Sequence, residues 1–254
     1  MMTRTVVCGV LTLLITATDA SAQAEWYGFY VGANVRGGLG NSQATTSTIY
    51  TTDGYFATSS VPAINEAGVQ VVKPKGVLAG GQAGYNFQRD ALVVGIEADF
   101  GLERLTRSSS ASITEEYPCC AGTDFTIEQT IEPSWLMTAR PRIGYATESL
   151  LLYGTAGLAI AKIDYRAVFT DTYADATESG VVNKNVTGFA AGAGIEGPLS
   201  EGWSFKIEYL FTDLGEVSTT SDNFEAFGFP WSNTFTHTTT IKWHLLRFGV
   251  NVRF

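Results

Sequence analysis

The sequence has few charged residues, and basic residues are scarcer than acidic ones. Charged residues make up 16% of the 254 positions, with 16 Lys and Arg against 25 Asp and Glu and a net charge of −9. A protein that binds nucleic acid needs a basic surface to neutralise phosphates. The charge balance therefore predicts no nucleic acid partner.

Histidine, cysteine and long apolar runs are also scarce. Two His and three Cys do not supply the four clustered ligands of a zinc site, so no metal site is predicted. Beyond the N-terminal segment, no stretch approaches the ~18 consecutive apolar residues of a membrane-spanning helix. Glycine and aromatic residues are plentiful instead, with 27 Gly, 15 Phe, 11 Tyr and 5 Trp.

Residues 1–24 have the layout of a secretory signal peptide: one cation, a short apolar stretch and then small residues. The apolar stretch is too short to span a membrane, although a retained signal anchor is the alternative. Two A-x-A frames place cleavage after Ala22 or Ala24. Residues 25–254 contain no linker-like boundary and no repeat of fixed period, so we expect one exported domain.

The C-terminal segment alternates strictly between large apolar residues and other residues. Its apolar positions are Leu246, Phe248, Val250, Val252 and Phe254. A period of two predicts a β-strand with one apolar face. A strand that ends the chain on an aromatic residue is typical of a transmembrane β-barrel, where Phe254 would join the interfacial aromatic girdle.

Seven further segments fit strands, most of them with the same alternation. The predicted strands cover residues 27–36, 76–87, 92–105, 132–146, 150–163, 185–196, 203–214 and 246–254. Short connections alternate with long ones at 40–75, 106–132, 164–184 and 215–240, as in barrels with short periplasmic turns and long external loops. We therefore predict an all-β fold: an eight-stranded antiparallel transmembrane β-barrel with four long external loops and both termini in the periplasm.

The polar faces of these strands predict the content of the lumen. An eight-stranded barrel is about wide enough for side chains alone to fill it, and its apolar faces must meet the hydrocarbon. The inward set balances cations against carboxylates, and lumen glycines would make room for the long side chains. It consists of Arg36, Arg140, Arg142, Lys206 and Arg247 with Glu97, Asp99, Glu103, Glu196 and Glu208. Because buried charges are tolerated when paired, we expect an ion-paired lumen; a soluble antiparallel barrel, the alternative, would invert the two faces.

Several short motifs carry a family resemblance over essentially the whole exported chain. They are WYGFYVGA (26–33), GGQAGYNF (80–87), VVGIEADF (93–100), RIGY (142–145), LYGTAG (152–157) and FGVNVRF (248–254). In this order they resemble the small outer-membrane immunogenic proteins of alphaproteobacteria, porin-family relatives of the OmpA-type barrel. The resemblance implies insertion by the outer-membrane assembly machinery, with the strand ending at Phe254 as its recognition signal. It also implies a surface antigen, an envelope-stabilising protein or a porin.

Catalytic candidates are few. His237 and His244 lie near the predicted external rim, and a catalytic His would need a Ser and an acid. Neither has a Ser nearby in a recognisable motif, and only distant acids such as Glu225 could assist. No catalytic residue is predicted. Haem binding, which the resemblance implies for some relatives, has no motif here, so no cofactor is predicted.

Cys119 and Cys120 are adjacent in a predicted external loop. Neighbouring Cα atoms lie ~3.8 Å apart, below the usual ~4.4 Å minimum for a disulfide. We therefore expect two free or intermolecularly paired thiols, with a vicinal disulfide as the alternative in an oxidising compartment. The loop at 222–231 carries four aromatic residues, which suit either contact with a partner or packing within the loop.

Two functional classes remain. One is a non-enzymatic structural and surface-interaction barrel with a side-chain-filled lumen, and the other is a small-solute diffusion porin. Either would lie in the outer membrane of a Gram-negative bacterium, surrounded by outer-membrane lipid and lipopolysaccharide. Its loops are the place for an extracellular or host partner.

Overall fold

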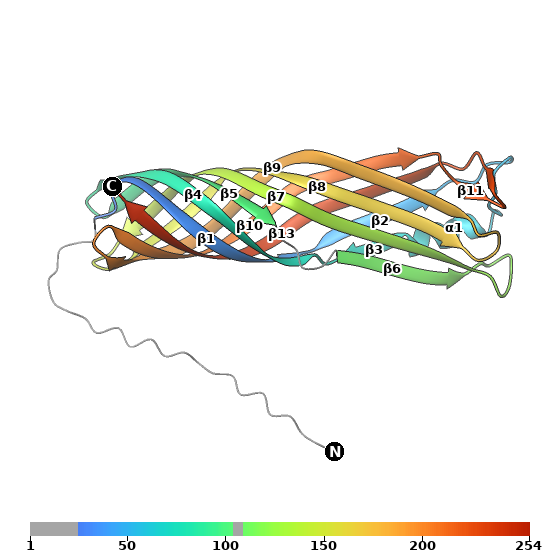
Figure 1. The fold of residues 1–254 in the computed structure, drawn as a ribbon, viewed down its shortest axis with the longest axis horizontal. Helices are drawn as coiled ribbons and strands as arrows, with labels where there is room; N and C mark the ends of the chain where they lie inside the picture. The colour runs from blue at the N-terminus through green and yellow to red at the C-terminus, as the bar shows by residue number, and fades with distance from the viewer. Residues whose placement is uncertain (1–24, 104–108) are drawn as a thin grey trace, which may run out of the picture.

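The computed structural model describes residues 25–103 and 109–254, so the predicted signal peptide at 1–24 lies outside the described residues. Most of the described residues lie in β-strands, and there is one short helix. It forms a long cylinder with the C-terminus at one end and helix α1 near the other (Figure 1). In the described ranges no helix has the length and apolar character needed to cross a membrane.

Eight long strands form a closed ring of antiparallel pairs. In order around the ring they are β1 (Gly28–Gly40), β4 (Lys75–Arg89), β5 (Leu92–Glu103), β7 (Asp124–Ala146), β8 (Leu151–Asp171), β9 (Thr177–Ser200), β10 (Trp203–Ser221) and β13 (Phe235–Arg253). The ring closes where β13 pairs with β1, from Tyr30 opposite Arg253 to Gly40 opposite Trp243. Closure leaves no sheet edge in this part of the wall, as a backbone surrounded by hydrocarbon requires.

Shorter elements prolong the ring away from the C-terminus. They are β2 (Ser42–Thr48), α1 (Ser60–Ala67), β3 (Val69–Val72), β6 (Ser109–Glu116), β11 (Glu225–Ala226) and β12 (Phe229–Pro230). Strand β2 continues β1 after Asn41 and pairs with β13, while β3 leads through Pro74 into β4. Strand β6 pairs with β7. In the described residues, β1 and β4 are therefore interrupted at about the same level, and β2 and β3 continue the wall beyond it.

The four predicted long loops are a point of correction, because most of their residues are in strands. Residues 40–75 hold β2, α1 and β3, and the long ring strands extend far into the other three segments. Most of these extensions have few outward apolar residues; β2, for example, has the sequence SQATTST. Because the predicted strands rested on outward apolar residues, most of them are shorter than the strands of the structure.

Strand β13 shows how the two faces of the wall exchange character along one strand. Near the C-terminus, Leu246 and Phe248 point outward, with exposed fractions of 47% and 52%. Farther along, Ile241 and Trp243 point inward and are at most 5% exposed, while Lys242 between them points outward. Neighbouring residues of a strand face opposite sides, and this alternation continues without interruption along β13. What changes is which side carries the apolar residues: the outer side near the C-terminus and the inner side farther along.

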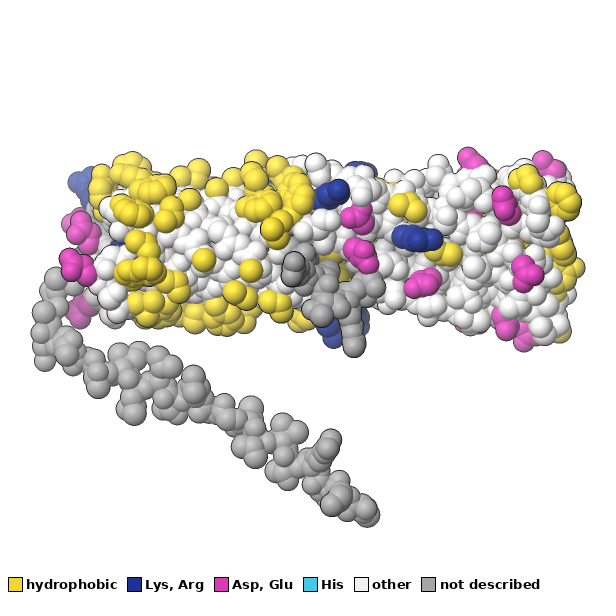
Figure 2. Space-filling view, viewed as in Figure 1, with side chains coloured by type: hydrophobic (Ala, Val, Ile, Leu, Met, Phe, Trp, Pro, Cys, Tyr) yellow, Lys and Arg dark blue, Asp and Glu magenta, His cyan; other side chains and the backbone are white. Residues whose placement is uncertain are grey.

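This reversal divides the molecule into two halves. The belt half, nearest the C-terminus, is largely apolar outside, and the outer half is mainly polar outside with scattered charged side chains (Figure 2). The outer half has an apolar core inside, which includes Ala44, Ile131, Leu136, Ala161, Ile163, Leu214, Val217 and Ile241. The uniform apolar-outward facing predicted from the sequence holds for the belt half only. The outer half is instead polar outside and apolar inside, which is the facing expected of a soluble antiparallel barrel.

Candidate functional site

An ion-pair network fills the lumen of the belt half, with Arg140 near its centre. The Arg140 guanidinium lies 3.0 Å from carboxylate oxygens of Glu97, Asp99 and Glu208. All four side chains are at most 3% exposed. They come from β5, β7 and β10, whose inward positions meet because the register sets Glu97 opposite Arg140.

Two further arginines bind the same carboxylates from the β1–β13 side. Arg247 Nη1 lies 2.5 Å from Glu208 Oε1 and 3.3 Å from Asp99 Oδ2. Arg36 Nη1 lies 3.0 Å from Asp99 Oδ1. Arg36 and Arg247 are opposite each other in the β1–β13 register, so Asp99 joins two cations that would otherwise repel.

Lys206 and Arg142 complete the network toward the C-terminal end. Lys206 Nζ lies 2.6 Å from Glu97 Oε2 and 4.0 Å from Glu208. Arg142 Nη1 lies 3.1 Å from Glu196 and 3.8 Å from Glu97. The structure thus brings together nine of the ten predicted lumen residues. The side chain of the tenth, Glu103, lies outside the described part, and without it cations outnumber carboxylates by one.

Tyrosines that the sequence analysis did not single out also belong to this network. The hydroxyl of Tyr30 donates to Glu97 at 2.8 Å, and that of Tyr153 donates to Glu208 at 2.9 Å. The Arg142 guanidinium lies 4.7 Å and 5.1 Å from the centres of the two rings, which suits cation–π contact. Tyr30 shares the polar face of its strand with Arg36, so facing could have identified it. Tyr153 lies on a strand that is apolar and Gly-rich on both sides, so its inward position did not follow from the sequence.

Lumen glycines provide space for the long side chains. A Cβ atom on Gly101 would lie 2.7 Å from Arg36 Nη2, and one on Gly157 would lie 2.8 Å from the Arg140 backbone. The absence of a side chain therefore lets these groups approach the wall closely.

Apolar residues close the lumen above and below the ion pairs. On the outer side, Leu210, Trp243 and Leu245 point inward and are at most 5% exposed. At the C-terminal end, Trp26 is fully buried, its carbonyl accepts a hydrogen bond from Asn86 Nδ2 at 3.0 Å, and Arg253 stacks on its ring. The ion pairs thus lie between two apolar barriers.

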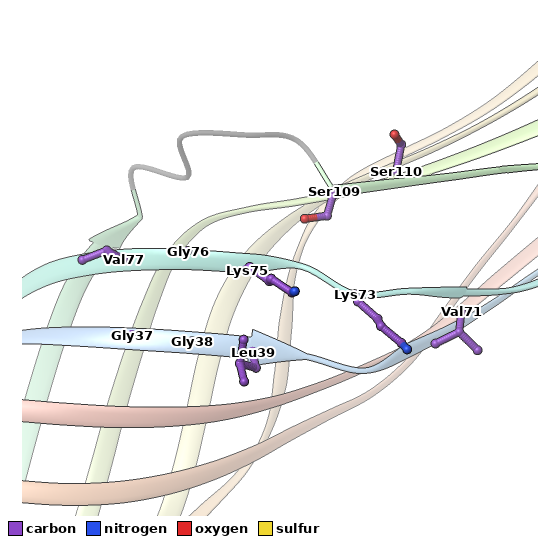
Figure 3. Close-up of a pocket in the computed structure, with 10 residues that line it drawn as sticks. All are labelled: Gly37, Gly38, Leu39, Val71, Lys73, Lys75, Gly76, Val77, Ser109 and Ser110. Atoms are coloured by element: carbon purple, nitrogen blue, oxygen red, sulfur yellow. The ribbon is translucent and has the colours of Figure 1, made fainter. Parts of the chain in front are cut away.

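A surface groove of about 910 Å³ marks the outer edge of the apolar belt, near the breaks in the ring strands (Figure 3). Lys73 and Lys75 line it together with the apolar Leu39, Val71 and Val77. All five side chains are exposed, and Figure 3 shows both lysines directed over the space between β1 and the β3–β4 segment. Apolar surface beside two cations suits an amphiphile with an anionic headgroup.

The predicted rim position is wrong for His237, whereas His244, opposite Leu39, lies near the outer edge of the belt. His237 is fully buried in the outer half, with Nδ1 3.0 Å from Thr46 Oγ1 and Nε2 3.1 Å from both Glu178 Oε1 and Ser221 Oγ. The sequence could not reveal this contact of Ser, His and acid, because the partners lie on separate strands. In a catalytic triad the acid and the Ser bind opposite ring nitrogens, whereas here they share one. His244 lies on the outer face of the belt half beside Tyr209, at 2.6 Å from its hydroxyl.

The adjacent cysteines form a vicinal disulfide, so the expected free thiols are wrong. The turn that carries Cys119 and Cys120 packs near aromatic residues at the far end of the outer half.

The aromatic segment 222–231 packs partly into the same cluster: Phe224 is fully buried, whereas Phe227 and Phe229 are more than half exposed. Across the described residues, no group of three or more His, Cys, Asp or Glu could hold a metal ion.

Phe254 lies on the outer face at the C-terminal edge of the belt. Its backbone N–H donates to the Phe29 carbonyl at 2.9 Å, and the two ring centres are 6.3 Å apart. The Phe254 side chain is among the most exposed apolar groups, at 78%. This is a position at which an aromatic ring would lie in a membrane interface.

Comparison with known proteins finds outer-membrane proteins as relatives of this chain. The family model for the outer membrane protein beta-barrel domain matches residues 8–254. The 31 kDa outer-membrane immunogenic protein of Brucella melitensis is 32% identical over 91% of this chain and 84% of its own length. A 25 kDa outer-membrane immunogenic protein of Brucella ovis is 26% identical over 80% of this chain and 77% of its own length. Among solved structures, Neisserial surface protein A has 14% identity and a TM-score of 0.38, covering 89% of this chain and 97% of that one.

Proposed function

The chain belongs to the outer membrane protein beta-barrel family, and from this premise we infer that it is a closed, non-enzymatic barrel that displays its outer half at the cell surface. It is a protein of the Gram-negative outer membrane, as its family and its relatives are. The ring of eight antiparallel strands is the transmembrane barrel, and the signal peptide at 1–24 directs its export.

The apolar belt sets the orientation. A transmembrane barrel carries an outward apolar band about 25 Å tall with aromatic girdles at both interfaces. The outward residues of the belt half supply such a band, and Phe29, Tyr85, Trp203 and Phe254 lie at its C-terminal edge. Both termini therefore face the periplasm, and the charged outer half extends beyond the membrane. Phe254 also serves as the signal for the assembly machinery.

The observation that carries this proposal is the filled lumen. Nine paired charges, all at most 3% exposed, occupy the belt half, and apolar layers cover them on both sides. A passage for solutes would need water along the axis, which small barrels filled by side chains lack. The barrel thus acts as a membrane anchor for a surface structure, in keeping with the immunogenic proteins it resembles.

Planar-bilayer recording of the refolded protein tests this function. We expect no steady single-channel conductance at neutral pH, with a large porin as the positive control. Large, stable currents would instead support a small-solute porin. The same preparation should be heat-modifiable on gels, which establishes that the recorded protein is folded.

The groove at the belt edge is the proposed contact with lipopolysaccharide. Lys73 and Lys75 lie where phosphates of the outer leaflet would be, and Leu39 and Val77 offer apolar surface to an acyl chain. Replacing both lysines by Gln should reduce co-purification of lipopolysaccharide, and the matched change Lys184→Gln, away from the groove, should not. Equal retention by the two variants would remove the groove from the proposal.

A further inference from the structure

A separate cavity of about 210 Å³ lies at the tip of the outer half. Its lining consists of Tyr55, Phe56, Ala57, Ser60, Tyr117, Cys119, Cys120 and Tyr173. These residues come from the β2–α1 connection with the first residue of α1, from the β6–β7 connection and from the β8–β9 connection, so three separate segments build one cavity. Four aromatic side chains and a vicinal disulfide contribute to its wall.

A buried carboxylate lies next to this aromatic wall. The hydroxyls of Tyr55 and Tyr117 donate to Asp171 Oδ2 at 2.6 Å and 3.0 Å. The other oxygen, Oδ1, accepts the backbone N–H groups of Ala174 and Ala176 at 3.1 Å and 3.0 Å. Burial, together with Asp171, raises the pKa of both tyrosines above its ordinary value. The two phenols therefore stay neutral and donate to the Asp171 side chain.

The surroundings of the cavity are uniformly acidic. The tip segments 49–60, 116–124, 171–178 and 221–235 each carry Asp or Glu, and none contains Lys or Arg. Such a field attracts cations and repels phosphates and other anions. Aromatic rings bind cations through their negative faces, and cages of such rings recognise quaternary ammonium groups.

We propose that this tip cavity binds a quaternary or methylated ammonium group. Its volume is below the roughly 300 Å³ of the smallest drug-sized pockets, so it fits a headgroup rather than a larger solute. The group could come from a free solute such as choline or from the choline headgroup of a lipid. Binding at the tip does not depend on whether the lumen is closed, so either proposal can fail without the other.

The test compares choline with a neutral alcohol of the same shape, in which carbon replaces the ammonium nitrogen. Each is titrated into the refolded chain in a non-ionic detergent without choline groups, and tryptophan fluorescence is recorded. The Trp231 ring lies 5.7 Å from Tyr55 and can report occupancy. We expect saturable choline binding and about tenfold weaker binding of the neutral alcohol. Equal affinities, or no binding of choline, would overturn the proposal.

Matched variants localise the signal. Tyr173 lines the cavity and is 51% exposed, so Tyr173→Ala should fold normally and weaken choline binding several-fold. Tyr50 is 48% exposed and does not line the cavity, so Tyr50→Ala should bind as the parent does. Equal affinities in the two variants would count against this cavity.

Vesicles distinguish the two sources of the group. Phosphatidylglycerol vesicles that carry the protein are mixed with phosphatidylcholine vesicles, and their clustering is followed by light scattering. Clustering that free choline reverses assigns the site to a lipid headgroup. Choline binding without clustering assigns it to a free solute.

Discussion

Replacing Glu97 by Gln should destabilise the barrel more than removing any single cation of the lumen. Glu97 lies 2.6 Å from Lys206, 3.0 Å from Arg140 and 3.8 Å from both Arg142 and Arg247. Gln keeps the size of the side chain but removes the charge. Cations already exceed the described carboxylates by one, and the substitution raises this excess to two.

Two values limit the loss in the free energy of unfolding that Glu97→Gln should cause. Removing one partner of a buried ion pair costs about 3–5 kcal/mol. The network can reduce the excess if Lys206 gives up its proton, and neutralising a lysine of ordinary pKa, about 10.4, costs roughly 3 kcal/mol at pH 8. We therefore expect a loss of about 3 kcal/mol at pH 8, because the cheaper response sets the limit. The loss should shrink by about 1.4 kcal/mol for each further pH unit.

Guanidinium unfolding of the barrel refolded in lipid vesicles, at pH 8 and pH 9, measures this loss. Arg140→Met is the informative comparison, because it equalises the described charges while keeping an unbranched side chain. Ile143→Val, on the outward face at 60% exposure, controls for the lipid-facing wall. The reasoning fails if Arg140→Met costs more than Glu97→Gln, or if the Glu97→Gln loss does not change with pH.

Three further outcomes are expected. Deleting Phe254 should lower the amount of heat-modifiable protein in the outer membrane several-fold, because the closing strand loses its interfacial ring; normal levels would show that the residue is dispensable. In a background without cysteines, a Cys probe at Asp222 should react with an impermeant reagent on intact cells and one at Ser200 should not; equal labelling would contradict the orientation. The raised pKa of Tyr117 means that its neutral hydroxyl contributes stability fully below the ordinary tyrosine pKa of about 10, and this contribution falls as pH rises above it. The protection of tip amides from hydrogen exchange, relative to their intrinsic exchange rates, should therefore fall above pH 10, and Tyr117→Phe should reduce that fall.

The strands of the belt half could be predicted from the sequence because the surrounding lipid requires apolar residues on their outer face. Outward residues such as Leu246 and Phe248 must be apolar, so alternation reveals both the strand and its facing. In the outer half, water is on the outside and the same alternation has the opposite meaning. Strand ends near Thr236 and Thr238 were missed because Thr and Ser occupy both hairpins and loops, and only pairing across the sheet establishes them as strand.

The lumen residues followed from facing, but their partners did not. Inward position identifies Arg140 and Glu97, and the choice among several carboxylates depends on register and on side-chain length. The register appears only once the strands are paired. The cavity at the tip was harder still, because Tyr55, Tyr117 and Tyr173 come from three connections that no local pattern relates.

The exchange of faces within single strands also constrains biogenesis. An exported chain in the periplasm exposes the apolar side of the belt half, which only lipid can cover. It also exposes the apolar side of the outer half, around Ile241 and Trp243, which can collapse in water before the membrane is reached. A prematurely collapsed outer half would be too bulky to pass through the bilayer. Export should therefore require periplasmic chaperones that keep these segments unfolded until insertion. A chain released before insertion should aggregate rather than stay soluble.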